Sequence, residues 1–136
     1  MNLSKPCYCH SGTTYQNCCY PFHQGIDYPS TTQELLKSRY SAYALCMADY
    51  IKKTMIEPAL LHFNRDDIVG SSTEWLELNI YQQIKGSKSD HEGSIIFDVF
   101  YKLKPDLAIE GFKEHSFFVK QNGKWVYKMS LSFLKL

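Results

Sequence analysis

The sequence predicts an α+β fold in which helices come first and an antiparallel sheet follows. Apolar residues recur at three- and four-residue steps between residues 32 and 54, and from Trp75 the hydrophobic period changes to two. The dipeptide Asn122-Gly123, the strongest short signal for a β-hairpin, joins two of the extended runs. A chain of 136 residues is long enough for one compact domain with a small appendage.

The first 29 residues differ in composition from the rest of the chain. They carry only Lys5 and Asp27 as formal charges, and they contain four of the five cysteines. A segment this short cannot build a core of its own and needs a staple or a surface to lie on. We therefore expect two parts, residues 1–29 as a small element and residues 30–136 as the α+β domain.

The first long helix is expected to begin behind Thr31. Thr31 and Glu34 have the spacing of a capping box, in which two side chains satisfy otherwise unpaired N–H groups. Asp49 is expected to cap a second, shorter helix, so that the span 32–54 breaks near Ala48. The apolar stripe of this span consists of Leu36, Tyr40, Tyr43, Met47, Tyr50 and Ile51.

Residues 58–71 suggest one or two further short helices, and four extended runs follow. The first two runs begin near Trp75 and Ser94, and the last two span residues 107–120 and 124–131. A two-residue hairpin loop at Asn122-Gly123 fixes the register of the last two. The cross-strand pairs it predicts are Phe118–Tyr127, Val119–Val126 and Lys120–Trp125. A curved sheet wrapped over a helix can leave a pocket between the two.

Charge and hydropathy narrow the classes of partner. The net charge of +1 argues against broad electrostatic binding to nucleic acid or to an anionic membrane surface. No run approaches the roughly 20 apolar residues of a membrane span, and the N-terminus lacks the apolar stretch of a signal peptide. We expect a cytoplasmic protein, in which thiols are normally kept reduced. The oligomeric state is left open.

Four cysteines lie close together in the run CYCHSGTTYQNCC, residues 7–19. Disulfides are disfavoured by the cytoplasmic setting, and a bond between adjacent Cys18 and Cys19 requires a strained peptide. A thioredoxin-like redox centre requires Cys-x-x-Cys, a spacing that neither pair has. Unliganded structural thiols are typically buried among apolar neighbours, whereas these lie among Ser, Gly, Thr, Gln and Asn. A structural site of four thiolates, Cys7, Cys9, Cys18 and Cys19, is the favoured interpretation, and Zn²⁺ is the expected ion.

The spacing of the cysteines is compatible with one tetrahedral ion. Cys7 and Cys9 point to the same side of an extended segment, and Gly12 can supply the turn that reverses the chain. The second pair is adjacent in sequence, so the backbone must turn sharply there to aim both sulfurs inward. With four protein ligands no coordination position stays open, which favours a structural site over a catalytic one. His10 and His23 are possible substitutes for one ligand, although His10 is expected in a loop and His23 on the surface or packed.

The cysteine run resembles the SEC-C motif, a small zinc-binding element of pattern Cys-x-Cys-x8-Cys-(Cys/His) found at the C-terminus of the SecA translocase. Ser11, Gly12 and Tyr15 match its usual core in addition to the four cysteines. The resemblance implies zinc binding and a protein partner through the zinc element. In SecA the loop is basic and is associated with binding the chaperone SecB and with ribosome contact. Here the corresponding positions are Thr13, Thr14, Gln16 and Asn17, so the charged docking surface is absent.

Three further blocks resemble the YchJ family of uncharacterised bacterial proteins. They are LLKSRYSAYALCMADYIKKT (35–54), STEWLELNI (72–80) and EHSFFVKQNGKWVYKMS (114–130). Members of that family carry a SEC-C motif followed by a nuclear transport factor 2-like (NTF2-like) domain. The resemblance implies a cystatin-like cone of N-terminal helices packed on a curved antiparallel sheet.

The cavity expected between the helix 32–54 and the sheet is a second candidate site. Its candidate residues are Tyr43, Asp49, Trp75, Glu114 and His115. Neighbours in a strand point to opposite faces, so Glu114 and His115 cannot pair with each other. No catalytic residue is assigned, and a non-enzymatic binding or adaptor protein is expected. The alternative is a small-molecule-binding protein or an enzyme that uses the cavity, which convergence of Asp49, Glu114 and His115 would favour.

Two further side chains carry structural expectations. Arg39 is expected to form an ion pair beneath the sheet with Glu74 or Glu114. Cys46 is expected to be a packed core thiol, because it lies in the region of the helical stripe.

Overall fold

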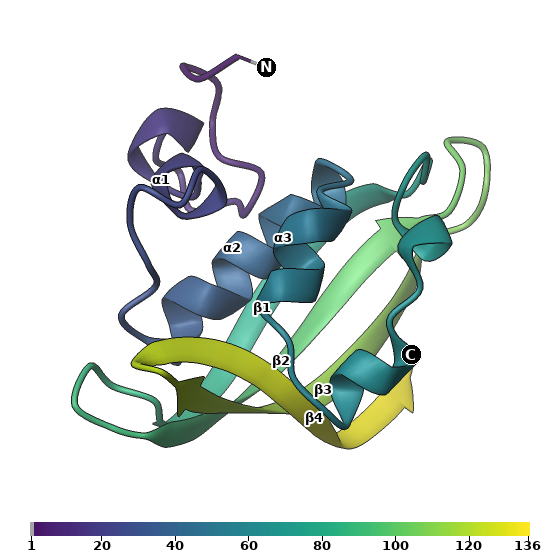
Figure 1. The fold of residues 1–136 in the computed structure, drawn as a ribbon. Helices are drawn as coiled ribbons and strands as arrows, with labels where there is room; N and C mark the ends of the chain where they lie inside the picture. The colour runs from purple at the N-terminus through teal and green to yellow at the C-terminus, as the bar shows by residue number, and fades with distance from the viewer. Residues whose placement is uncertain (1) are drawn as a thin grey trace.

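The computed structural model describes residues 2–136 and confirms the α+β fold (Figure 1). Four strands form one antiparallel sheet in the order β1-β2-β3-β4. The strands are β1 (Glu74–Lys85), β2 (Glu92–Lys102), β3 (Glu110–Gln121) and β4 (Lys124–Lys135). The helices are α1 (Tyr20–His23), α2 (Thr32–Ala44) and α3 (Ala48–Lys53), with three short 3₁₀ turns, η1 (Tyr15–Asn17), η2 (Ala59–His62) and η3 (Arg65–Asp67).

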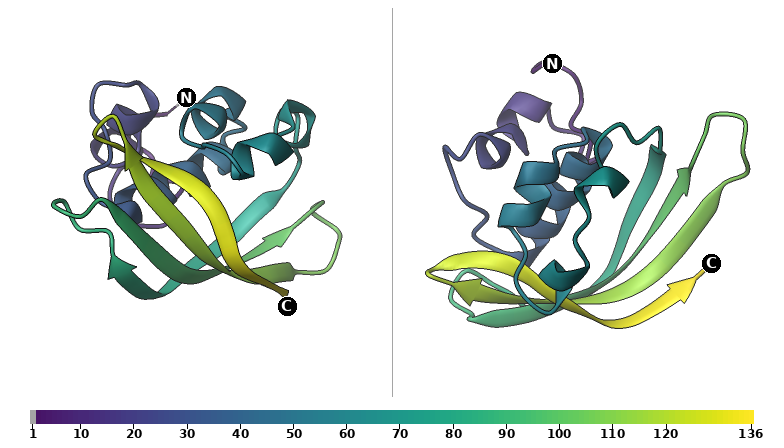
Figure 2. Two further views of the ribbon diagram at one scale, coloured as in Figure 1. Left: turned by 60° about the horizontal axis from the view of Figure 1, so that its bottom comes forward. Right: turned by 45° about the vertical axis from the view of Figure 1, so that its right-hand side comes forward.

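Helix α2 lies over the concave face of the strongly curved sheet, and α3 packs beside α2 (Figure 1 and Figure 2). The Thr31 hydroxyl caps α2 by accepting a hydrogen bond from the Glu34 N–H at 3.1 Å. The Glu34 carboxylate accepts from the N–H of Ser30 at 2.9 Å instead of reaching Thr31, so the capping box is only half formed. The expected break is present, because α2 ends at Ala44 and α3 begins at Ala48. Asp49 does not cap α3, however, since the N-cap position is Met47 and no side chain caps this helix.

The predicted hairpin register is confirmed. In the β3–β4 ladder, Phe118 pairs with Tyr127, Val119 with Val126 and Lys120 with Trp125. Register shifts near Ser116 and Phe117 bend this ladder further along. Such bulges increase the local twist, and β4 continues to Lys135, beyond the expected end of the strand.

The N-terminal element packs on the side of α2 away from the sheet, and its chain is drawn in purple in Figure 1. Its buried side chains Cys7, Cys9 and Tyr15 belong to the same hydrophobic cluster as Leu35 of α2 and Ile95 of β2. Element, helix and sheet therefore share one continuous core, and α2 is the layer between the other two.

The structural expectations for Arg39 and Cys46 are wrong. Arg39 forms no ion pair with Glu74 or Glu114; its Nη1 donates to the Ile51 carbonyl at 2.9 Å and to Oγ1 of Thr54 at 2.7 Å. A backbone carbonyl at the end of α3 thus takes the role expected of a carboxylate. Cys46 is only half-buried, because it lies in the turn between α2 and α3 with a positive φ of 57°.

Within residues 2–136, none of the helices combines the length and the apolar character that crossing a membrane requires.

Candidate metal centre

A short hairpin-like loop presents the first two cysteines. Pro6 bridges to Thr14, and the Cys7 N–H donates to the Thr13 carbonyl at 2.8 Å. Gly12 supplies the expected reversal with a φ of +87°, a region that favours glycine. The loop therefore holds Cys7 and Cys9 on one side of the segment.

The second pair of cysteines sits on a sharp backbone turn. The 3₁₀ turn η1 ends at Asn17, and Cys18 has φ −128° and ψ −97°, outside the helical and strand regions. Cys19 is already close to helical, with φ −85° and ψ −19°, and forms the N-cap of α1. This abrupt change of direction between neighbours is what lets both sulfurs face the first pair.

The four sulfurs converge on one point. All four Sγ atoms lie within 4.8 Å of one another, with Cys9 and Cys18 at 3.5 Å and Cys18 and Cys19 at 3.9 Å. All five thiols of the chain are free, so no disulfide competes for them. Zinc–sulfur bonds of about 2.3 Å in a tetrahedron place sulfurs about 3.8 Å apart. The donor set therefore fits a tetrahedral zinc ion in both chemistry and spacing.

Burial makes the cluster a poor place for uncompensated charge. Cys7, Cys9 and Cys19 are each at most 3% exposed, while Cys18 is half-buried and its Sγ lies 3.2 Å from the Ser11 hydroxyl. Contacts with Cys7 and Cys9, together with burial, raise the pKa of Cys19, whereas contacts with Cys19 and Cys7 lower the pKa of Cys9. One thiolate thus suppresses ionisation of its neighbour, a conflict that a divalent cation removes.

Neither histidine belongs to the cluster of metal-binding groups. His10, with a φ of 64°, lies in the expected loop, and its Nε2 is 3.0 Å from the Tyr40 hydroxyl. His23 is 6% exposed, with Nδ1 2.6 Å from the Tyr15 hydroxyl and Nε2 2.7 Å from the Ser38 carbonyl. A carbonyl only accepts, so Nε2 carries the proton and Nδ1 accepts from Tyr15. His23 therefore joins the N-terminal element to α2, a role that residue type and spacing do not distinguish from ordinary packing.

The expected cavity lies between α2 and the sheet and has a volume of about 320 Å³. Three of the five candidate pocket residues, Tyr43, Trp75 and Glu114, line it. The other two do not. Asp49 is exposed and pairs with Arg65, and His115, half-buried, contacts the Ser94 hydroxyl at 2.9 Å.

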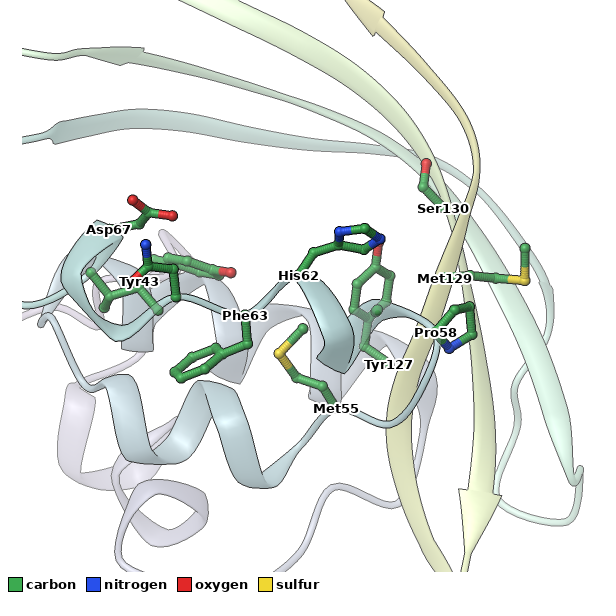
Figure 3. Close-up of a pocket in the computed structure, with 12 residues that line it drawn as sticks. Tyr43, Met55, Pro58, His62, Phe63, Asp67, Tyr127, Met129 and Ser130 are labelled. Atoms are coloured by element: carbon green, nitrogen blue, oxygen red, sulfur yellow. The ribbon is translucent and has the colours of Figure 1, made fainter.

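A second hollow of about 470 Å³ opens beside this cavity, between β4 and the segment that follows α3 (Figure 3). His62 of η2 and Met129 of β4 are among its lining residues. Tyr43 and Tyr127 line both hollows. The two tyrosines therefore lie at the boundary between the outer hollow and the deeper cavity.

Sequence reasoning did not anticipate Arg39 and Tyr127 as cavity residues. Both line the cavity, and the Arg39 guanidinium carbon lies 5.1 Å from the centre of the Tyr127 ring. The aromatic residues of β4 are a signal that could have identified Tyr127, whereas the sequence predicts an ion pair for Arg39.

Fold and cysteine cluster together define a SEC-C motif protein built on an NTF2-like domain. The family model described as the middle NTF2-like domain of YchJ matches residues 31–130. The chain belongs to the YchJ family, whose curated relatives are called UPF0225 proteins.

The similarity extends over nearly the whole chain. A UPF0225 protein of Sodalis glossinidius is 33% identical over 128 residues, which cover 92% of this chain and 82% of the relative. A UPF0225 protein of Deinococcus radiodurans is 35% identical over 126 residues, covering 90% of this chain and 86% of the relative.

Two solved structures have the same fold. A SEC-C motif containing protein from Rhodopseudomonas palustris superposes with a TM-score of 0.79 at 26% identity, covering 94% of this chain and 98% of that protein. A second, from Psychrobacter arcticus, has a TM-score of 0.75 at 25% identity, with coverage of 95% and 84%.

Proposed function

We propose that Cys7, Cys9, Cys18 and Cys19 hold one structural zinc ion in a non-enzymatic binding protein. The convergence of the four Sγ atoms within 4.8 Å is the observation that carries the zinc assignment. Four thiolates complete the tetrahedral shell, so the ion has no position for substrate. Such a cluster is stable where thiols stay reduced, which supports a cytoplasmic location.

The zinc ion acts by fixing the element that covers α2. It joins the loop at Cys7 and Cys9 to the turn at Cys18 and Cys19, and α1 follows directly. His23 at the end of α1 then bonds the Ser38 carbonyl of α2. Metal binding thus holds the outer face of the helix whose inner face lines the cavity.

The cavity supports ligand binding more than catalysis. Its walls are mostly aromatic and aliphatic, and Glu114 is its one carboxylate, with no histidine among the lining residues. Asp49 and His115, which an acid–base mechanism of the expected kind requires at this point, lie elsewhere. A small apolar cavity with few polar groups is the usual form of a small-molecule site.

A protein partner at the zinc element is a second candidate. The exposed loop residues Ser11, Gly12 and Thr13 surround the cluster and offer polar but uncharged contacts. Affinity capture from the native cell tests this proposal by comparing wild type with a Cys18→Ser/Cys19→Ser double variant. A partner retained by wild type and lost with the double variant supports it, and equal retention contradicts it.

Metal analysis tests the zinc assignment. Protein purified under reducing, chelator-free conditions is expected to contain about one zinc per chain. Cys9→Ser should lose most of this zinc, whereas Cys46→Ser, which removes a thiol outside the cluster, should keep it. Absence of zinc in wild type, or equal loss in both variants, would overturn the assignment.

A further inference from the structure

Arg39 is a buried cation with unused hydrogen-bond donors. The residue is 6% exposed, and its two hydrogen bonds both start from Nη1. Nε and Nη2 have no hydrogen-bond partner among residues 2–136. Since arginine side chains lie almost fully buried only when paired, this side chain has an incomplete environment.

No carboxylate in the described chain completes that environment. The two ion pairs among residues 2–136 are Asp49–Arg65 and Glu110–Lys135, both far from full burial. Glu114 lines the same cavity, but its Oε2 accepts from the hydroxyls of Tyr127, at 3.0 Å, and Ser116. Burial lowers the pKa of Arg39, and the nearby charge of Glu114 offsets this effect only in part.

The space in front of Arg39 suits an apolar body. The cavity is lined mainly by aromatic and aliphatic side chains, among them Trp75, Leu78, Phe97, Val99, Phe112 and Phe118. Its volume of about 320 Å³ is near the lower end for small-molecule sites, which favours a small ligand over a lipid chain. The cavity therefore combines a hydrophobic wall with one buried, under-used guanidinium.

We propose that this cavity binds a small aromatic or aliphatic monocarboxylate, whose carboxylate pairs with Nε and Nη2 of Arg39 and whose apolar body packs against the aromatic wall. The planar guanidinium suits the two oxygens of a carboxylate, and such pairs strengthen away from water. Glu114 lines the same cavity, and its negative charge opposes every anionic group there, so a single carboxylate paired with the Arg39 guanidinium is favoured over a ligand with two. The ligand enters past Tyr43 and Tyr127, which border the outer hollow.

This inference deepens the proposed ligand-binding function and rests on it. The probes are 3-phenylpropionate and its neutral analogue 3-phenylpropanamide, titrated separately into ¹⁵N-labelled, zinc-loaded wild type while the backbone amide shifts are followed. The carboxylate is expected to bind about tenfold or more tightly than the amide, because hydrogen bonds to charged partners are the stronger ones.

Two variants locate the site. Leu78→Phe places a ring in the cavity and should abolish binding of both probes. Leu76→Phe, two residues away and outside the cavity lining, is the matched control and should bind as wild type does. Arg39→Lys should reduce the preference for the carboxylate several-fold, because one ammonium group cannot bond Ile51, Thr54 and a ligand together.

The outcomes separate the two proposals. Equal affinity for both probes, abolished by Leu78→Phe, overturns the role of Arg39 and leaves ligand binding in the cavity intact. No binding of either probe at millimolar concentration, or binding that Leu78→Phe does not change, overturns the cavity as a ligand site. The wild-type comparison of two probes stands even where a variant fails to fold.

Discussion

The Nε2 atom of His23 donates a hydrogen bond to the backbone carbonyl of Ser38 at 2.7 Å, and this contact joins the N-terminal element to α2. On the other side of the ring, Nδ1 accepts from the Tyr15 hydroxyl at 2.6 Å. Ser38 in turn contacts the Tyr50 hydroxyl at 2.7 Å, so the connection continues into α3. The N-terminal element is thereby held to both helices by a buried polar chain as well as by apolar contact.

Replacing His23 by alanine should destabilise the protein by about 2 kcal/mol or more, because the Tyr15 hydroxyl loses its partner in a buried site. Urea unfolding of the zinc-loaded protein measures this change. His91→Ala is the matched control, because the side chain of His91 is exposed. Equal midpoints for the two variants would show that the buried ring does not fasten the element.

The same histidine predicts a pH dependence. Burial lowers the pKa of His23 below its ordinary 6.5, so the unfolded chain takes up a proton at higher pH than the folded one. The contribution of neutral His23 is fully present above pH 6.5 and is lost as pH falls through the lowered folded-state pKa. Between about pH 7 and about pH 5, the free energy of unfolding should fall more steeply for wild type than for His23→Gln. Parallel profiles would contradict this prediction.

Cys9→Ser should loosen the N-terminal element while leaving the sheet folded. Without a complete donor set the metal is lost, and residues 2–29 keep only their packing and the His23 contacts. Hydrogen exchange should show faster exchange in residues 2–29 and α2, with protection retained in β2 and β3. Uniform loss of protection would mean that the shared core depends on the metal throughout.

Gly86→Ala should destabilise the protein more than Gly123→Ala. Both glycines have positive φ, 82° and 78°, so both variants strain the backbone, by roughly 1 kcal/mol or more. At Gly86 an added Cβ also overlaps the buried side chain of Thr32 at the start of α2, whereas at Gly123 nothing lies within 4 Å. Thermal unfolding of both variants tests this difference. Equal midpoints would show that the contact between Gly86 and Thr32 does not limit the residue at position 86.

Those parts of the fold that depend on neighbouring residues in the sequence were predictable. Asn122-Gly123 determines the register from Phe118 to Tyr127 because the turn and the strand alternation agree. The position of the helix break near Ala48 was predicted, but the signal used for it was wrong, because Asp49 lies within the first turn of α3 and does not cap it. The continuation of β4 to Lys135 was not predictable, because bulges near Ser116 depend on how the whole sheet curves.

The same holds for the candidate sites: the cysteine cluster was predictable from neighbouring residues, and the lining of the cavity was predictable only in part. The cysteine spacing is a local signal, and the four Sγ atoms do converge. Arg39 donates a hydrogen bond to the backbone carbonyl of Ile51. Every residue type has such a carbonyl, so the sequence does not reveal this acceptor. Residue type does not show which way a side chain points: His115 follows Glu114 on β3 and so faces the other side of the sheet, and Asp49 is exposed on α3 and pairs with Arg65.

Zinc K-edge X-ray absorption of the protein as purified tests the central claim most directly. The account predicts a first shell of four sulfur atoms at about 2.3 Å with no lighter ligand. Cys46→Ser should give the same spectrum, because Cys46 lies outside the cluster. A nitrogen or oxygen ligand at about 2.0–2.1 Å in the first shell would contradict a closed four-cysteine site.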